Sequence, residues 1–162
     1  MSTLTKYILT FLVSMVPLIE LRGGVPIGTV TFELPAHWVL PLCMIGNMLP
    51  VPIIFFFARK VLIWGSDKKY TAKFFTWCLE KGKHGGEKLK EKAGAKGMFI
   101  ALMLFVGIPI PGTGAWTGTL AASMLDLDFK KSVIAVLGGI VLAGVIMGLG
   151  SLGLFSAIRA LF

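Results

Sequence analysis

The chain has 162 residues, of which 56% are hydrophobic and 15% charged, and it carries a formal net charge of +8. Long apolar runs at both ends exclude an ordinary soluble domain and indicate an integral membrane protein with a single membrane domain, residues 1–162. In a membrane protein, an excess of Lys and Arg usually reflects which loops face the cytoplasm. No segment has the character of a nucleic-acid-binding module, so we expect no nucleic-acid partner.

The first apolar segment, residues 7–19, would be about 20 Å long as a helix and falls short of a hydrocarbon core about 30 Å thick. It follows Lys6 as a signal peptide would, but no small-residue cleavage site comes after it, so we expect the N-terminus to be retained. The segment meets Pro17 and then the polar stretch "ELRGG". We expect the helix to restart at Pro26, because proline is favoured in the first turn of a helix.

Two of the later apolar segments, residues 39–57 and 132–158, are long enough to span a membrane. Between them, residues 98–108 form a short run that ends in "IPIPGTGAWTGTL". In this stretch prolines stop a helix and glycines permit unusual backbone angles. The residues concerned are Pro109, Pro111, Gly112 and Gly114.

The order of these features repeats along the chain. A shift of 92 residues places Pro17 on Pro109 and Gly46 on Gly138. The two short segments therefore read as re-entrant hairpins, each followed by one span, and two such units in tandem must have opposite orientations. Four plain spanning helices are the alternative that hydropathy also permits. The predicted fold is an all-α integral membrane protein with two inverted repeats, residues 4–57 and 98–162, joined by a basic cytoplasmic amphipathic helical segment, residues 58–97.

The basic residues indicate the topology. Eleven of the sixteen Lys and Arg residues lie in residues 58–97, and Lys130 and Lys131 follow the second hairpin. The positive-inside rule then predicts a multi-pass protein of the inner (plasma) membrane, with the 58–97 segment cytoplasmic and both termini outside. Within that segment we expect an interfacial helix over residues 69–81, anchored by anionic membrane lipids.

Small residues recur at four-residue spacing in the last span, at Ala135, Gly139 and Ala143. Such residues let helices approach closely in lipid, and the same face could serve a homodimer. Cys43 and Cys78 fit neither a metal cluster nor a disulfide framework. We expect free thiols, and no metal or cofactor.

Glu20 and Arg22 are the charges that need explanation, because each costs about 2.5–3.5 kcal/mol near the centre of a bilayer. On one continuous helix they would point about 200° apart, whereas at a hairpin tip both can face an internal cavity. They form either a structural salt bridge or a site. Helix restarts after Gly24 and after Pro111 would aim positive dipole ends at the middle of the membrane, which suits an anion. Asn47, also at bilayer depth, could bond a hairpin backbone or contact substrate.

The stretches "ELRGGVPIG" and "PIPGTGAWTG" resemble the two signatures of the family catalogued as putative small multidrug export proteins, and the resemblance covers essentially the whole chain. It implies an export function. More distantly, paired re-entrant hairpins with an acidic residue and an arginine resemble the DedA-like membrane proteins. That resemblance implies proton-coupled movement of polyprenyl-phosphate lipid carriers, but the motifs do not match residue by residue, so only the architecture carries over.

The first functional hypothesis is a secondary transporter or lipid flippase for a small-molecule or lipid-phosphate substrate, driven by an ion gradient because the sequence has no ATP-binding P-loop. Glu20 would be the protonatable coupling group and Arg22 the anion clamp. The expected substrate and ion site consists of Glu20, Arg22, Gly23, Gly24, Pro26, Asn47, Pro109, Pro111, Gly112, Thr113, Gly114, Trp116 and Thr117.

Two other classes of function remain open. A multidrug/proton antiporter would use Glu20 for either a proton or a cationic drug, although Arg22 would repel that drug. A lipid-binding assembly subunit would transport nothing. An intramembrane enzyme is least favoured, because no nucleophile-elbow serine and no paired aspartates occur at the hairpin tips, and we expect no catalytic residues.

Overall fold

The computed structural model describes residues 1–17, 19–68, 72–110 and 113–161, and for residues 59, 74, 78, 79, 81–90, 92, 151, 152 and 154–161 it describes the backbone alone. Its elements are α1 (Thr3–Met15), α2 (Glu20–Pro26), the π-helical turn η1 (Ile27–Thr31), α3 (Ala36–Met48), α4 (Pro50–Ser66), α5 (Ala72–Gly107), α6 (Ala115–Met124) and α7 (Phe129–Leu161). The described residues contain no strand, which confirms the all-helical prediction.

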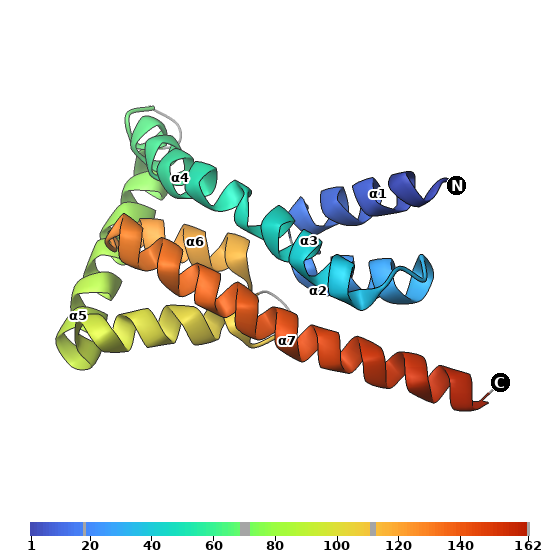
Figure 1. The fold of residues 1–162 in the computed structure, drawn as a ribbon. Coiled ribbons are helices and arrows are strands. Elements are labelled where there is room, and N and C mark those ends of the chain that lie inside the picture. Colours follow the sequence, from blue (N-terminus) through green and yellow to red (C-terminus); the bar gives the residue numbers. More distant parts are fainter. Residues whose placement is uncertain (18, 69–71, 111–112, 162) are drawn as a thin grey trace.

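Two helix–break–helix units dominate the arrangement (Figure 1). The first consists of α1 followed by α2 and η1, and the second of the apolar end of α5, Ala93–Gly107, followed by α6. The two breaks lie near the middle of the molecule, and the units open toward opposite ends (Figure 1). The first helix stops before Pro17 and the second before Pro109, as the sequence predicted. Re-entrance and inversion concern the placement of these units in a bilayer, and they stay predictions.

The first long span is built from two helices placed end to end. α3 and α4 together cover Ala36–Ser66, so the span is longer than the predicted residues 39–57. The helix is interrupted at Leu49, directly before Pro50. Proline has no backbone N–H to bond the carbonyl four residues earlier, here that of Gly46, which explains the interruption. Phe129–Gly150 of α7 is the second segment long and apolar enough to cross a membrane.

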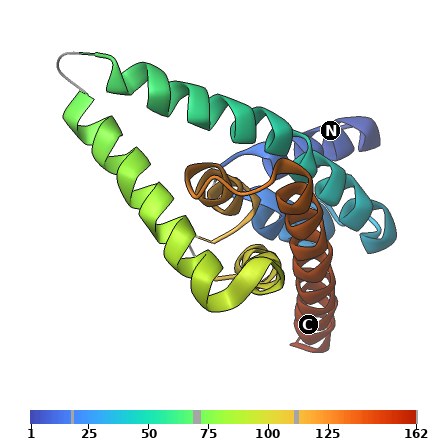
Figure 2. The ribbon, with the colours of Figure 1, turned by 90° about the vertical axis from the view of Figure 1, so that its left-hand side faces the viewer.

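The basic linker is helical over most of its length. α5 starts at Ala72 and continues into the second unit, changing direction at Gly94, whose φ of 62° is rare for residues with a side chain. Residues 69–71, where the interfacial helix was expected to begin, lie outside the described residues. α4 and α5 diverge from their connection and pack on α6, which lies between them (Figure 2).

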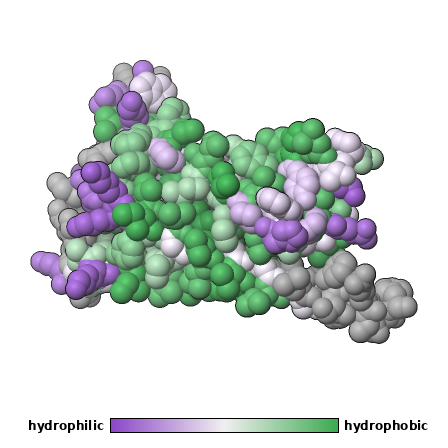
Figure 3. Space-filling model, viewed as in Figure 1, coloured by the Kyte–Doolittle hydropathy of each residue, from purple (hydrophilic) through white to green (hydrophobic). Residues whose placement is uncertain are grey.

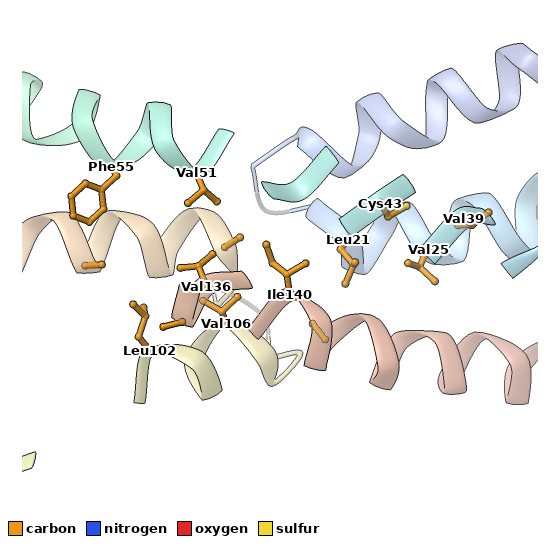
Figure 4. Packing of buried hydrophobic residues seen from close by; sticks show 14 of the residues in the cluster. Leu21, Val25, Val39, Cys43, Val51, Phe55, Leu102, Val106, Val136 and Ile140 are labelled. Carbon is orange, nitrogen blue, oxygen red and sulfur yellow. The ribbon is translucent and has the colours of Figure 1, made fainter. Parts of the chain in front are cut away.

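The buried core joins the two units through α7. Leu21 of α2 lies beside Ile140 of α7, Val25 lies farther along α2 in the same buried cluster, and Val106 of α5 lies beside Val136 (Figure 4). All five side chains are buried. The core therefore continues from one unit into the other.

The small residues of α7 serve packing within the chain. A Cβ added at Gly139 would lie 2.6 Å from Cβ of Val106, and one at Gly144 would lie 2.1 Å from Cε of Met44. Ala135 and Ala143 are buried as well. The predicted close approach of helices is thus confirmed, and a homodimer stays a prediction.

The surface has the distribution expected in a bilayer. A band of hydrophobic side chains covers the centre of the face in Figure 3, and hydrophilic residues gather at the two ends. Large apolar side chains such as Trp38, Ile53 and Leu149 are more than half exposed. Exposed apolar surface of this extent is typical of contact with lipid. The start of α1 and the end of α7 lie at one end of the molecule, and the end of α4 and the start of α5 lie at the other (Figure 1), the relative arrangement that the predicted topology requires.

Candidate functional site at the crossed helix breaks

Glu20 opens α2 and reaches across to the second unit. Its side chain is 3% exposed, and its backbone has a φ of 52°, which is uncommon for a residue other than glycine. The carboxylate accepts hydrogen bonds from the backbone N–H groups of Ala115 (3.1 Å to Oε2) and Trp116 (2.9 Å to Oε1). These are the first two amides of α6, which have no partner within their own helix. Glu20 therefore caps a helix that begins 95 residues later in the chain.

Gly114 provides the space for this cap. Its φ is 144°, a conformation that side chains rarely adopt. A Cβ at this position would lie 2.1 Å from Oε2 of Glu20. Glycine is thus required both by the backbone turn and by the approach of the carboxylate. Pro111 and Gly112, predicted to share this role, lie outside the described residues.

Arg22 binds the other side of the same break. Its guanidinium donates hydrogen bonds to the backbone carbonyls of Ile108 (3.1 Å) and Ile110, and more weakly to that of Val106 (3.4 Å). It also donates to Oγ1 of Thr113 at 2.8 Å. The hydroxyl of Thr113 in turn lies within 3.0 Å of the Ile108 and Ile110 carbonyls. Arg22 therefore supplies hydrogen-bond donors to backbone carbonyls at the end of α5 and at the start of the break.

The signs of the two charges match the helix ends that they contact. The N-terminus of a helix carries a partial positive charge and its C-terminus a partial negative charge. Glu20 lies at the N-terminus of α6 and Arg22 at the C-terminus of α5. Both residues belong to the described part of the chain, and they form no ion pair with each other. The geometry thus differs from the salt bridge that was one of the two hypotheses for this pair.

Trp116 makes the reciprocal contact with the first unit. Its indole N–H donates to the carbonyl of Met15 at 3.1 Å. Met15 is the last residue of α1, so this bond satisfies one of the carbonyls left free where α1 stops before Pro17. Met15 was not among the predicted site residues, because its backbone carbonyl has no signature in the sequence.

The first break differs from its prediction in one respect. The chain becomes helical again at Glu20, and Gly23, Gly24 and Pro26 lie inside the helix, so the predicted restart after Gly24 is wrong. Because Pro26 has no N–H, the carbonyl of Arg22 loses its usual partner, and the wider turn η1 follows directly. A Cβ at Gly24 would lie 3.0 Å from Sγ of Cys43, which is a packing role.

The other predicted residues lie at different distances from this centre. Thr117 approaches the carbonyl of Gly114 at 3.4 Å, within the first turn of α6. Pro109 lies in the second break between two carbonyls that bind Arg22. Asn47 is buried in α3, and its Oδ1 has no hydrogen-bond partner among the described residues. The site that the structure brings together therefore consists of Glu20, Arg22, Thr113, Gly114 and Trp116.

Comparisons with curated proteins and with solved structures give no match. One family model does match, over residues 20–146. That range begins at Glu20. It includes Arg22, the backbone groups that Glu20 and Arg22 bind, the second break and just over half of α7. Since it covers more than half of the chain, the protein belongs to the membrane-protein family described as "Putative small multi-drug export protein".

Proposed function

We propose that this protein is a secondary transporter that couples proton movement to the passage of an anionic or amphipathic substrate, such as a polyprenyl-phosphate lipid, between the two helix breaks. One observation carries the proposal: the carboxylate of Glu20 occupies the N-terminal amides of α6 at the point where the breaks meet. Helix N-termini are natural anion sites, and here a titratable side chain of the protein fills one.

The coupling follows from competition for these amides. An ionised Glu20 supplies the negative charge that the N-terminus of α6 favours. A protonated Glu20 is neutral and holds the amides less strongly, so an anionic group of the substrate can replace it. One proton on Glu20 then accompanies one negative charge bound at Ala115 and Trp116. Carboxylates within membranes often serve such proton relays.

Arg22 supports the same function from the other side of the break. Three carbonyls and the Thr113 hydroxyl hold its guanidinium in place, and the substrate anion would bind beside it. A guanidinium has five N–H donors in a planar fork, so it can bind backbone and a phosphate together. Arg22 would thereby hold the anion while Glu20 carries the proton.

In this proposal the bilayer is centred on the two breaks, which makes both units re-entrant. The hydrophobic band of the surface would lie in the hydrocarbon core, and the hydrophilic ends at its two faces (Figure 3). The two units open in opposite directions. Loss of the contacts at one break would therefore open the substrate site to one side of the membrane at a time.

The experiment is a binding measurement with farnesyl phosphate on the purified protein over a series of pH values. Wild-type affinity should fall as the pH rises, since ionised Glu20 competes with the phosphate. Glu20→Gln should bind at all pH values, because the amide is always neutral. Glu33→Gln, which changes an exposed glutamate, is the matched control and should keep the wild-type pH dependence.

Substitution of Arg22 distinguishes this proposal from its rivals. Arg22→Gln should abolish binding of farnesyl phosphate, and Arg22→Lys should weaken it less, because lysine keeps the charge and loses the fork. Retained anion binding in a folded Arg22→Gln variant would contradict the proposal. A cationic-drug antiporter would show the reverse pattern with tetraphenylphosphonium: loss in Glu20→Gln and tolerance in Arg22→Gln. Binding with no proton-driven flux in liposomes would indicate an assembly subunit.

A further inference from the structure

A cavity with a polar mouth lies between α5 and α7, away from the breaks. Its volume is about 100 Å³. The wall is formed by apolar residues of α5, by the turn before α7 and by the first turns of α7. These residues are Ala95, Met98, Phe99, Leu102, Leu127, Asp128, Lys131, Ser132 and Ala135.

A second cavity of about 160 Å³ adjoins the first and is almost entirely apolar. The two share Met98, Leu102 and Leu127 as walls. Beyond them the second cavity is lined by both helices of the second unit, through Ala101 and Phe105 of α5 and through small residues of α6. A cavity of about 150 Å³ in a protein core is large enough for benzene. The pair can therefore hold a stretch of hydrocarbon.

Of the polar groups that line the first cavity, Asp128 has a hydrogen-bond partner and the hydroxyl of Ser132 has none among the described residues. Oδ1 of Asp128 accepts a hydrogen bond from the backbone N–H of Lys131 at 2.9 Å, so this carboxylate serves the start of α7. Ser132 is 3% exposed, and its Oγ has no partner among the described residues. Leaving a buried hydroxyl unpaired is costly, so an unpaired one that lines a cavity indicates a missing partner. The side chain of Lys131 is exposed at the mouth.

We propose that these cavities bind one anionic lipid, with its phosphate on Lys131 and Ser132 and an acyl chain along the apolar walls. The basic residues near the cavity favour an anion, since Lys130 and Lys131 lie at the start of α7 and Lys96 follows Ala95 of the lining. The apolar lining favours a lipid over a soluble anion. The site is separate from Glu20 and Arg22 and does not depend on the transport function proposed above.

Lipid binding to the full chain, purified in neutral detergent, tests the headgroup. Phosphatidylglycerol should bind about tenfold more tightly than phosphatidylcholine, because both present a phosphate but the choline cation cancels its charge and is repelled by Lys131. Lys131→Gln should remove that preference. Lys130→Gln, an exposed neighbour that does not line the cavity, is the matched control for surface charge and should preserve it. Equal effects of the two substitutions would overturn the proposal.

Two further variants test the buried hydroxyl and the apolar walls. Ser132→Ala should weaken phosphatidylglycerol binding while leaving the lipid-free melting temperature unchanged or higher, whereas a structural role would leave lipid affinity unaltered. Ala101→Trp should block the second cavity and weaken both lipids, and Ile100→Trp, on an exposed position outside the lining, should not. If Ala101→Trp does not fold, Ser132→Ala alone decides.

Three results would reject the lipid assignment outright. If inorganic phosphate stabilises the protein as much as phosphatidylglycerol does, the acyl chain of the lipid is not recognised. Equal affinity for both lipids would show that the site does not select an anionic headgroup. Tetraphenylphosphonium that binds more tightly than phosphatidylglycerol and depends on Asp128 would make this a cation site.

Discussion

Glu20 and Arg22 are two residues apart and bind opposite sides of one helix break in the second unit, without forming an ion pair. Glu20 accepts from the first amides of α6, and Arg22 donates to carbonyls at the end of α5. Backbone groups freed by a broken helix cannot be left unpaired in lipid. The two charges thus explain how an interrupted helix can persist at the centre of the molecule.

Exchange of the two charges separates this geometry from a salt bridge. The double variant Glu20→Arg, Arg22→Glu would place a cation at the N-terminus of α6 and an anion at the C-terminus of α5, both unfavourable. We expect a melting temperature in detergent below that of either single variant. Partial recovery in the double variant would instead indicate a direct ion pair.

Arg22→Lys tests whether one side chain must bind several acceptors of the second break at the same time. A lysine ammonium is a point charge and cannot bind the Ile108 and Ile110 carbonyls and Thr113 in the same fork. We expect the free energy of unfolding to fall by about 0.5–1.5 kcal/mol for each hydrogen bond that the lysine cannot make, the usual net value of one such bond. Lys130→Arg, at an exposed position, is the control and should change nothing.

Gly114→Val should prevent the cap at α6 from forming. The backbone at Gly114 has a φ of 144°, and any Cβ would meet the Glu20 carboxylate at 2.1 Å. Gly153→Val is the matched control, because a Cβ at that position has no neighbour within 4 Å among the side chains that the structure describes. Expression and thermal stability measured side by side check the difference. Equal behaviour of the two variants would remove the argument that the second break needs glycine.

Trp116→Phe isolates the bond that returns to the first unit. The change removes the indole N–H that donates to Met15 and keeps an aromatic ring. We expect the free energy of unfolding to fall by about 1 kcal/mol, the typical net value of one hydrogen bond. Trp38→Phe, on an exposed tryptophan, should have no such effect. A similar loss in both would assign the effect to ring size.

The topology can be tested by labelling single cysteines in intact cells, after replacement of Cys43 and Cys78. Cysteines at Ser2 and Thr31 should label from outside, and those at Asp67 and Lys130 only after permeabilisation. The reason is the concentration of basic residues at one end. Labelling of positions 2 and 31 from opposite faces would show that the first segment spans, and the inverted repeat would then be wrong.

The sequence by itself determined the class of the protein and the positions where its helices stop. Apolar length predicted the two spanning segments, and Pro17 and the Pro109 to Gly114 stretch predicted the two breaks, because hydropathy and helix-breaking residues act locally. The small residues of the last span likewise predicted close packing, which the contacts of Gly139 and Gly144 confirm.

Only the tertiary structure decided what Glu20 and Arg22 touch. Their partners are the backbone amides and carbonyls of residues 84 to 96 positions later in the chain. Every residue except proline carries the same backbone donor and acceptor, so no pattern of side chains marks which of them will be left free and brought close. The left-handed backbone at Glu20 and the helical state of Gly24 and Pro26 likewise differ from the local preference, which favoured a restart at Pro26.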